Sequence, residues 1–461
     1  MASDLHGWLV ANVLFPLQEH AKGHWTGAVR RSLEKTQWFD AQRLQALQLT
    51  RLRGLLTAAA RDVPYYRELF ERLPFDPAKV RSLADVAQIP FLTKALIRAN
   101  QESLKSRAAR HLARSNTGGS SGEPLIFFLG RERVTHDVAA KWRATRWWDV
   151  DIGDREAVVW GSPIELNSQD RIRALRDWSF RTTLLPAFEM SDRRLDEFVD
   201  FIATKRPAML FGYPSALAKI ARHAERRGRS MLGAGVKVAF VTSERCYDDQ
   251  RDAIARVFGC RVANGYGGRD AGFIAHECPS GGMHITAEDV IVEIVDPAGQ
   301  PLPPGHSGEI VVTHLASADF PFIRYRTGDV ATLATGSCPC GRGLPMLENI
   351  QGRTTDFVVA QNGTVMHGLA LIYVVRDIPG IESFKIVQET AGHTRVFVVR
   401  GPGYAEADSA RIRDGLQARL GAGVTIDVVT VDTLPPEASG KHRYVVSRVT
   451  SAEVTGVAEH A

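Results

Sequence analysis

The sequence contains no long hydrophobic run, and this absence excludes a membrane-spanning protein of the usual helical kind. The main apolar stretch near the start, Trp8–Leu17, is about half the length of a membrane span and is interrupted by Asn12 and Pro16. It also lacks the basic leader and the small-residue cleavage site of a signal peptide. From these absences we expect a cytoplasmic protein without a membrane partner.

The chain has only a small excess of one charge sign and few cysteines. The chain has 57 basic and 52 acidic residues and a net charge of +5, which is too little to indicate nucleic-acid binding. Arginines such as Arg107, Arg110 and Arg114 recur at the spacing of a solvated helix face, so we expect no nucleic-acid partner. Five cysteines, an odd number, fit a reducing compartment better than a disulfide framework.

The chain is long enough for two or three domains, and its composition is that of a globular protein. Residues 1–80 are predicted to form a helical lead-in because leucines recur there with helical period. From about 125 to 265 short apolar segments alternate with helical ones, which predicts a largely parallel sheet covered by helices. Residues 285–335 are predicted to form a β-rich, antiparallel subdomain.

The pattern of apolar and turn-forming residues changes again after residue 355. The following segment contains Asn362-Gly363, the favoured hairpin turn, and then alternating strand and helix patterns. We therefore predict two domains, a large α/β domain over residues 1–355 and a small α+β domain over residues 356–461.

A loop rich in glycine and hydroxyl side chains stands out at Ser115–Pro124. Glycine lets the backbone turn its N–H groups toward one point, and hydroxyls beside such donors suit a phosphate. It is not a P-loop of the GxxxxGK[ST] kind, because no lysine follows the last glycine. By itself the pattern leaves two interpretations open, a phosphate cradle and a plain surface loop.

Cysteine and histidine form a second distinctive constellation. Its members are two close pairs, Cys278 with His284 and Cys338 with Cys340. They match the Cys₃His set of structural zinc sites, with His276 as a reserve ligand. Buried free thiols are the alternative, and this is the simpler interpretation for Cys246 and Cys260.

Five polar islands follow one another along the chain, and four further short motifs accompany them. The islands are Ser115–Pro124, Asn264–Asp270, Tyr325–Asp329, Gly352–Asp356 and Pro435–Lys441. This series resembles the adenylate-forming, AMP-binding ligase superfamily. The accompanying motifs resemble its phenylacetate-CoA ligase and CapK-like branch, and they are Val63–Arg67, Phe91–Lys94, Tyr213–Ala216 and Phe273–Cys278. The resemblance covers nearly the whole chain.

The resemblance implies an enzyme that uses ATP and Mg²⁺ to convert a carboxylic acid to an acyl-AMP and then passes the acyl group to a thiol. Coenzyme A is the acceptor we expect, while a carrier-protein thiol or an amine stays open, as does a homodimer. A non-catalytic nucleotide-binding scaffold of the same fold is the alternative from another class, since fold alone does not prove function.

The resemblance also implies a nucleotide site. Its members are Ser115, Thr117, Gly118, Gly119, Ser120, Ser121 and Gly122 of the loop, together with Tyr266, Gly267 and Asp329. The loop would hold the β- and γ-phosphates, Tyr266 would lie by the adenine, and Asp329 would accept both ribose hydroxyls. Arg353 would lie near the ribose and phosphates as one of the catalytic residues.

Two further catalytic residues are implied. In the superfamily the Tyr-Gly motif continues to threonine and glutamate, whereas this chain has Arg269 and Asp270. Aspartate keeps the hard oxygen ligand that Mg²⁺ prefers but is one methylene shorter, which favours contact through water. Lys441 matches the catalytic lysine, whose charge would stabilise the transition state of adenylation. The small domain would rotate about a hinge at Asp356 and so withdraw the lysine.

The acyl pocket is the least determined part of the implied site. The resemblance places Trp142, Phe211, Tyr213, Ser243, Glu244 and Gly265 in its lining. Aromatic side chains at these positions would suit the flat ring of an aryl acid, but such residues are as often part of a core. No single residue identifies the acid.

Overall fold

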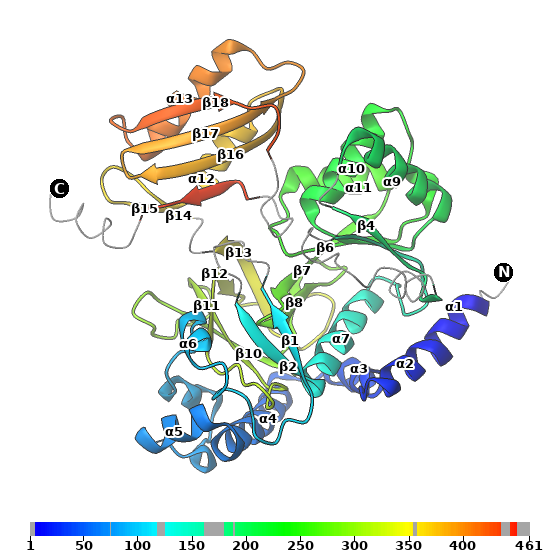
Figure 1. Ribbon diagram of the computed structural model, residues 1–461, viewed down its shortest axis with the longest axis vertical. Helices are drawn as coiled ribbons and strands as arrows, with labels where there is room; N and C mark the ends of the chain where they lie inside the picture. Colours follow the sequence, from blue (N-terminus) through cyan, green and yellow to red (C-terminus); the bar gives the residue numbers. More distant parts are fainter. Residues whose placement is uncertain are drawn as a thin grey trace. The chain divides into compact units, whose positions relative to one another are not determined.

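The computed structural model describes residues 5–73, 75–117, 125–160, 179–187, 190–353, 357–434 and 443–449. These residues divide into two compact units (Figure 1). The first extends to Ile350 apart from Gly328–Val330, and the second comprises those three residues and the described chain after Ile350. The mixed α/β class predicted from the sequence is confirmed, whereas the exact domain boundaries stay a prediction.

The first unit opens with helices, as the leucine spacing predicted. They are α1 (Leu5–Leu9), η1 (Val10–Leu14), α2 (Phe15–Ala21), α3 (Thr26–Thr36), α4 (Ala41–Asp62) and α5 (Pro64–Arg72). The Asp40 side chain accepts a hydrogen bond from the Arg43 backbone N–H and so caps α4. Pro64 begins α5, a position where its missing N–H costs nothing. Among the described residues, no helix combines the length and apolarity that crossing a membrane requires.

Short elements then lead to a hairpin that carries the glycine-rich loop. The short helices are η2 (Pro77–Lys79), η3 (Leu83–Gln88) and α6 (Lys94–Ala99). Strands β1 (Leu112–Asn116) and β2 (Ile126–Gly130) pair antiparallel, with Asn116 opposite Ile126. The loop therefore joins two strands whose ends are fixed next to each other. Helix α7 (Arg131–Arg146) follows directly.

An eleven-stranded sheet forms the centre of the first unit. Its parallel part contains β3 (Glu156–Trp160), β4 (Thr182–Pro186), β5 (Met209–Gly212), β6 (Val238–Thr242) and β7 (Arg261–Gly268). Helices α9 (Asp192–Lys205), α10 (Pro214–Arg226) and α11 (Asp248–Phe258) and the single turn η5 (Leu232–Ala234) alternate with these strands. This is the arrangement that the alternating pattern predicted.

The remaining strands extend the same sheet. They are β8 (Gly272–Glu277), β9 (Met283–Ile285), β10 (Val290–Val295), β11 (Ser307–His314), β12 (Tyr325–Leu333) and β13 (Met346–Arg353). The strand order is β10-β11-β12-β13-β9-β8-β7-β6-β5-β3-β4. The strands predicted over residues 285–335 are thus hydrogen-bonded into the central sheet and do not form a sheet of their own.

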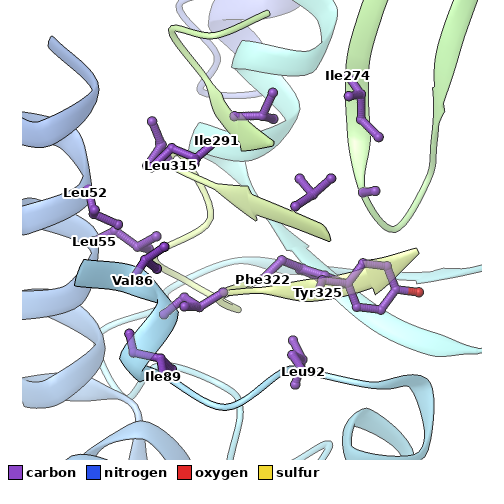
Figure 2. Close-up of a cluster of buried hydrophobic side chains, with 14 of the residues drawn as sticks. Leu52, Leu55, Val86, Ile89, Leu92, Ile274, Ile291, Leu315, Phe322 and Tyr325 are labelled. Atoms are coloured by element: carbon purple, nitrogen blue, oxygen red, sulfur yellow. The ribbon is translucent and has the colours of Figure 1, made fainter. Parts of the chain in front are cut away.

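A hydrophobic core joins the helical lead-in to this sheet. Figure 2 shows Leu52, Leu55, Val86, Ile89, Leu92, Ile274, Ile291, Leu315, Phe322 and Tyr325 within it. Leu52 of α4, Ile89 and Tyr325 are fully buried. Because β8 and β12 contribute to this core, the polar residues at their ends stand on a rigid base.

The second unit is an α+β structure. Strands β14 (Phe357–Val359) and β15 (Val365–His367) form the hairpin predicted by Asn362-Gly363. Strands β16 (Ile381–Thr390), β17 (His393–Arg400), β18 (Thr425–Thr430) and β19 (Val445–Ser447) form a sheet in the order β18-β17-β16-β19, with helices α12 (Leu369–Arg376) and α13 (Glu406–Leu420). The buried Gln388 side chain bonds both the N–H and the carbonyl of Val359, at 2.9 and 2.7 Å, and so fastens the hairpin to β16.

Candidate active site

The turn between β7 and β8 holds the carboxylate of Asp270 in one orientation. Tyr325 Oη donates to Asp270 Oδ2 at 2.6 Å, and the Ala271 backbone N–H donates to Oδ1 at 3.1 Å. Arg133 Nη2 donates to the Asp270 backbone carbonyl at 3.0 Å. The carboxylate is half-buried. Hydrogen bonds from β12, from α7 and from the turn itself therefore fix the residue that the sequence predicts as a contact for Mg²⁺.

A buried ionic group lies beneath this turn. Arg133 Nε donates to Asp137 Oδ2 at 2.9 Å, and His314 Nε2 lies 3.4 Å from Asp137 Oδ1. Burial opposes ionisation of Asp137, but the charge of Arg133 and the bond from His314 hold the pKa of this carboxyl at about 2. Burial lowers the pKa of His314 to about 4, and Arg133 acts in the same direction. Near neutral pH the group therefore contains one ion pair and a neutral imidazole.

Thr117 closes the base of the glycine-rich loop. Its backbone N–H donates to the Leu125 carbonyl, and its hydroxyl oxygen accepts the Leu125 N–H, each at 3.0 Å. Because a hydroxyl also carries a donor, Thr117 keeps a proton to offer to a further acceptor. Arg269 Nη1 lies 3.5 Å from the Asn116 carbonyl oxygen, so the β7–β8 turn reaches the start of the loop.

The other predicted nucleotide and catalytic residues are only partly described. Ser115 lies on β1, Tyr266 and Gly267 on β7, and Asp329 on β12 directly after Gly328. Gly267 needs its small size, because a Cβ there would lie 2.3 Å from the Gly272 carbonyl oxygen. Arg353 ends β13. Outside the described residues lie Gly118, Gly119, Ser120, Ser121, Gly122, Asp356 and Lys441.

Aromatic side chains predicted for the acyl pocket lie together at one end of the parallel strands. Trp160 stacks on Tyr213 with ring centroids 4.4 Å apart and on Phe211 at 6.0 Å. Phe211 in turn stacks on Phe240 at 5.9 Å. A Cβ at Gly265 would lie 2.7 Å from the Phe240 ring, so this glycine lets the ring pack directly on β7. Of the predicted residues, Phe211 and Tyr213 thus belong to one aromatic row, which Trp160 and Phe240 complete.

The polar members of the predicted pocket lie beside this row. Glu244 Oε2 accepts a hydrogen bond from the Ser215 backbone N–H at 3.3 Å, in the first turn of α10. Ser243 has a φ of +71°, a left-handed conformation that a non-glycine residue seldom adopts and that often marks functional sites. Trp142 is half-buried and has Phe15 edge-on against its ring at 6.3 Å.

Trp160 and Phe240 of this row, and Lys141 beside it, were not predicted from the sequence. Lys141 Nζ lies 4.5 Å from the Phe211 ring centroid and 5.0 Å from that of Trp142, and it pairs with Glu156 at 2.9 Å. No local motif marks these residues, because their meeting depends on how α7 and the strands pack.

The predicted metal ligands converge. The ligand atoms of Cys278, His284, Cys338 and Cys340 all lie within 4.8 Å of one another. Cys278 Sγ and Cys338 Sγ are 3.6 Å apart, close to the roughly 3.8 Å that tetrahedral coordination with zinc–sulfur bonds of about 2.3 Å requires. His284 Nδ1 lies 3.2 Å from the Leu344 carbonyl oxygen, which leaves Nε2 directed at the thiols. The donor set and its spacing fit a closed tetrahedral site.

Comparison with known proteins shows two family matches and several similar ligases. Residues 180–316 match the AMP-binding enzyme family, and residues 358–448 match the CapK C-terminal domain. A phenylacetate-coenzyme A ligase of Aromatoleum evansii is 24% identical over 90% of this chain and 97% of its own. One from Thermus thermophilus is 27% identical over 70% of this chain and 73% of its own. The chain is thus similar to adenylate-forming ligases of the phenylacetate-CoA ligase and CapK branch.

Three further proteins resemble this chain in sequence or in fold. Protein CapK of Staphylococcus aureus is 21% identical over 95% of both chains. A 2-hydroxyisobutyryl-CoA ligase in its postadenylation state has the same fold, with a TM-score of 0.72 and 20% identity over 92% of this chain and 93% of that one. The MatB protein of Rhodopseudomonas palustris has a TM-score of 0.53 and 19% identity, and the match covers 77% of this chain and 69% of that one. The two-unit architecture is thus the fold of solved ligases.

Proposed function

We propose that this ligase uses ATP to activate a carboxylic acid as an acyl-AMP and then transfers the acyl group to the thiol of coenzyme A. The observation that carries the proposal is the match to phenylacetate-coenzyme A ligases over up to 90% of this chain. The fixed Asp270 carboxylate and the aromatic row at the strand ends supply groups that such a reaction needs.

The proposed chemistry has two displacement steps. In the first, a carboxylate oxygen attacks the α-phosphorus, the bond to the bridging oxygen breaks, and pyrophosphate leaves with the electron pair. In the second, a thiolate sulfur attacks the acyl carbon and AMP leaves with the electron pair of the carbon–oxygen bond. Both steps need alignment of the reacting atoms and stabilisation of the charge on the leaving group.

Asp270 is the proposed contact for Mg²⁺, which when bound would neutralise charge on the phosphates. A hard cation prefers oxygen ligands and keeps several of its waters, so a fixed carboxylate is a suitable acceptor for a coordinated water. The loop hydroxyls, including that of Thr117, are proposed to bind the β- and γ-phosphates, and Asp329 the ribose. The aromatic row formed by Trp160, Phe211 and Tyr213 is proposed to contact the acyl group.

Zinc is the proposed occupant of the Cys₃His cluster. The three thiols and the imidazole would take all four coordination positions, so the metal would be structural and would take no part in the reaction. Its proposed role is to tie the Cys278–His284 turn to the chain at Cys338 and Cys340.

A second candidate function keeps the first step and changes the acceptor to an amine or a carrier-protein thiol. The resemblance to the CapK-like branch leaves these acceptors open, and residues 358–448 match the CapK C-terminal domain. Mass spectrometry of products formed with coenzyme A or with amines separates the two acceptors.

Replacement of the proposed catalytic lysine tests the first step. Lys441→Ala is expected to reduce acid-dependent ATP–pyrophosphate exchange by at least about a hundredfold, because a positioned charge at a transition state typically contributes that much. The assay is run over a panel of aryl, aliphatic and hydroxy acids. Lys79→Ala, which removes an exposed lysine on η2, serves as the matched control and should leave exchange unchanged.

Two outcomes would count against these assignments. Exchange in Lys441→Ala at a near wild-type rate would show that another group supplies the charge. Absence of exchange in the wild-type protein with every acid class would contradict the proposed ligase activity itself.

A further inference from the structure

We infer that Tyr325 and Arg133 are positioning residues that hold Asp270 in the orientation in which it meets the nucleotide-bound cation. The inference rests on the proposed function, which supplies the role of Asp270. Sequence motifs give neither residue a role. Tyr325 only opens the Tyr325–Asp329 island, and Arg133 lies on α7 outside every motif.

Tyr325 holds the Asp270 carboxylate from the side of the hydrophobic core. Its ring is fully buried and packs edge-on against Phe322 with centroids 5.2 Å apart. Figure 2 shows its hydroxyl turned away from the aliphatic cluster, and this hydroxyl donates to Asp270 Oδ2 at 2.6 Å. Hydrogen bonds from a hydroxyl to a carboxylate are short and strong, and a ring held on all sides gives this one a fixed direction. Rotation of the Asp270 side chain would break it.

Arg133 fixes the backbone of the same residue. Its side chain is 2% exposed, and its Nη2 donates to the Asp270 carbonyl at 3.0 Å. A buried guanidinium needs a counter-charge, and Asp137, one turn further along α7, supplies it through the 2.9 Å bond to Nε. The Phe322 ring lies against the guanidinium at 5.5 Å and also contacts Tyr325. One ring therefore supports both positioning residues.

Two glycines let the turn lie close to these side chains. Gly272 has a φ of +85°, and a Cβ there would lie 2.8 Å from Asp137 Oδ1 and 2.9 Å from Arg133 Nη2. A Cβ at Gly268 would lie 2.7 Å from Asp270 Oδ1. Glycine at these two positions lets the turn close tightly around the carboxylate and the guanidinium.

The bonded carboxylate retains capacity for a cation. Each Asp270 oxygen accepts a hydrogen bond, whereas an ionised carboxylate offers about four lone-pair sites. The remaining sites can accept the waters of a hydrated cation. Because aspartate is shorter than the glutamate that the family motif carries, its reach is limited, and a fixed direction matters more for it than for a longer side chain.

The experiment measures binding of Mn²⁺, a paramagnetic stand-in for Mg²⁺, to the full chain with a non-hydrolysable ATP analogue by electron paramagnetic resonance. Tyr325→Phe is expected to weaken Mn²⁺ binding about threefold to tenfold, as loss of one hydrogen bond of ordinary strength predicts. Asp270→Asn should weaken it at least as much. The double variant should equal Asp270→Asn alone, because the tyrosine acts through that carboxylate.

Tyr66→Phe is the matched control, since Tyr66 is buried in the same hydrophobic core. It should leave Mn²⁺ affinity unchanged, and thermal unfolding should show all variants folded. Equal Mn²⁺ affinity of Tyr325→Phe and wild type, no effect of Asp270→Asn, or additive effects in the double variant would each overturn the inference. If the Mn²⁺ affinities follow the expected order but no acid supports ATP–pyrophosphate exchange, the positioning role is supported and the proposed ligase activity is contradicted.

Discussion

His276 is the most unusual buried side chain of the large unit. It is fully buried, and neither ring nitrogen has a hydrogen-bond partner among the described residues. The Phe273 ring stacks on the imidazole with ring centroids 5.4 Å apart, and the centroid of the Phe240 ring lies 6.0 Å from it. The sequence suggested it as a reserve zinc ligand, but the four ligand atoms that converge are those of the two predicted pairs. Its place between two aromatic rings indicates a packing role.

This histidine should make stability depend on pH. Burial, assisted by nearby Arg143, lowers the pKa of His276 to about 3, whereas an exposed histidine titrates near 6.5. Between these values the unfolded chain binds more protons than the folded one, so stability rises with pH and is lost as pH falls from about 6.5. In His276→Phe, the urea concentration at the midpoint of unfolding is therefore expected to fall less between pH 7 and pH 5 than it does in the wild type.

Measurement of the urea midpoint across this range, for wild type and variant, checks the prediction. His20→Gln provides the comparison because His20 is exposed and meets water in both states. An unchanged slope in His276→Phe, or an equal reduction in His20→Gln, would contradict the assignment of the pH dependence to the buried ring.

At the scale of elements, the Cys₃His cluster connects segments far apart in the chain. Cys278 follows β8, His284 lies on β9, and the other two ligands precede β13, which pairs with β9 through Met346 and His284. A Cβ at Gly282 would lie 2.7 Å from Cys338 Sγ, so the turn between β8 and β9 is shaped around the cluster. A metal there would cross-link three strands of the central sheet.

The purified protein is accordingly expected to contain about one zinc per chain. Cys338→Ser should lose the metal and lower the melting temperature, because removal of a structural ligand removes binding energy that is also folding energy. Elemental analysis and thermal unfolding, with and without a chelator, measure both effects.

Cys246→Ser is the control for this experiment, since Cys246 is half-buried and lies outside the cluster. It should retain zinc and respond to chelator like wild type. Metal-free wild-type protein with unchanged stability after chelator treatment would rule out the zinc assignment.

At the scale of the whole molecule, the small unit has the attributes of an independent domain. It has its own sheet and its own buried residues, among them Ile386, Val398, Ile412 and Leu416. The CapK C-terminal domain family matches nearly the same residues, 358–448. We predict that a fragment beginning at Phe357 folds alone and unfolds in one cooperative transition.

Circular dichroism during thermal unfolding checks this prediction. Leu416→Ala should destabilise the fragment by about 2–5 kcal/mol, because it creates a cavity in the core, whereas alanine at the exposed Arg419 should have little effect. A fragment without a cooperative transition would show that the small unit depends on the rest of the chain.

The sequence by itself determined the class of fold, the resemblance to adenylate-forming ligases and the members of the Cys₃His cluster. Local patterns suffice for these: apolar segments alternate with helical ones over residues 125–265, Asn362-Gly363 predicts a hairpin, and Cys278, His284, Cys338 and Cys340 have the chemistry of a zinc site. The motif Asn264–Asp270 also predicted Asp270 as a catalytic residue. These features depend on residues close together in the chain or on a fixed order of short motifs.

Only the tertiary structure decided what holds Asp270 and which side chains complete the aromatic row. Tyr325 is 55 residues from Asp270 and Arg133 is 137 residues from it, and no local pattern links either residue to the carboxylate. Lys141 of α7 likewise meets Phe211 of β5, 70 residues away in the chain. Hydrogen bonds of this kind depend on the packing of whole elements, and a sequence read in local segments does not contain that packing.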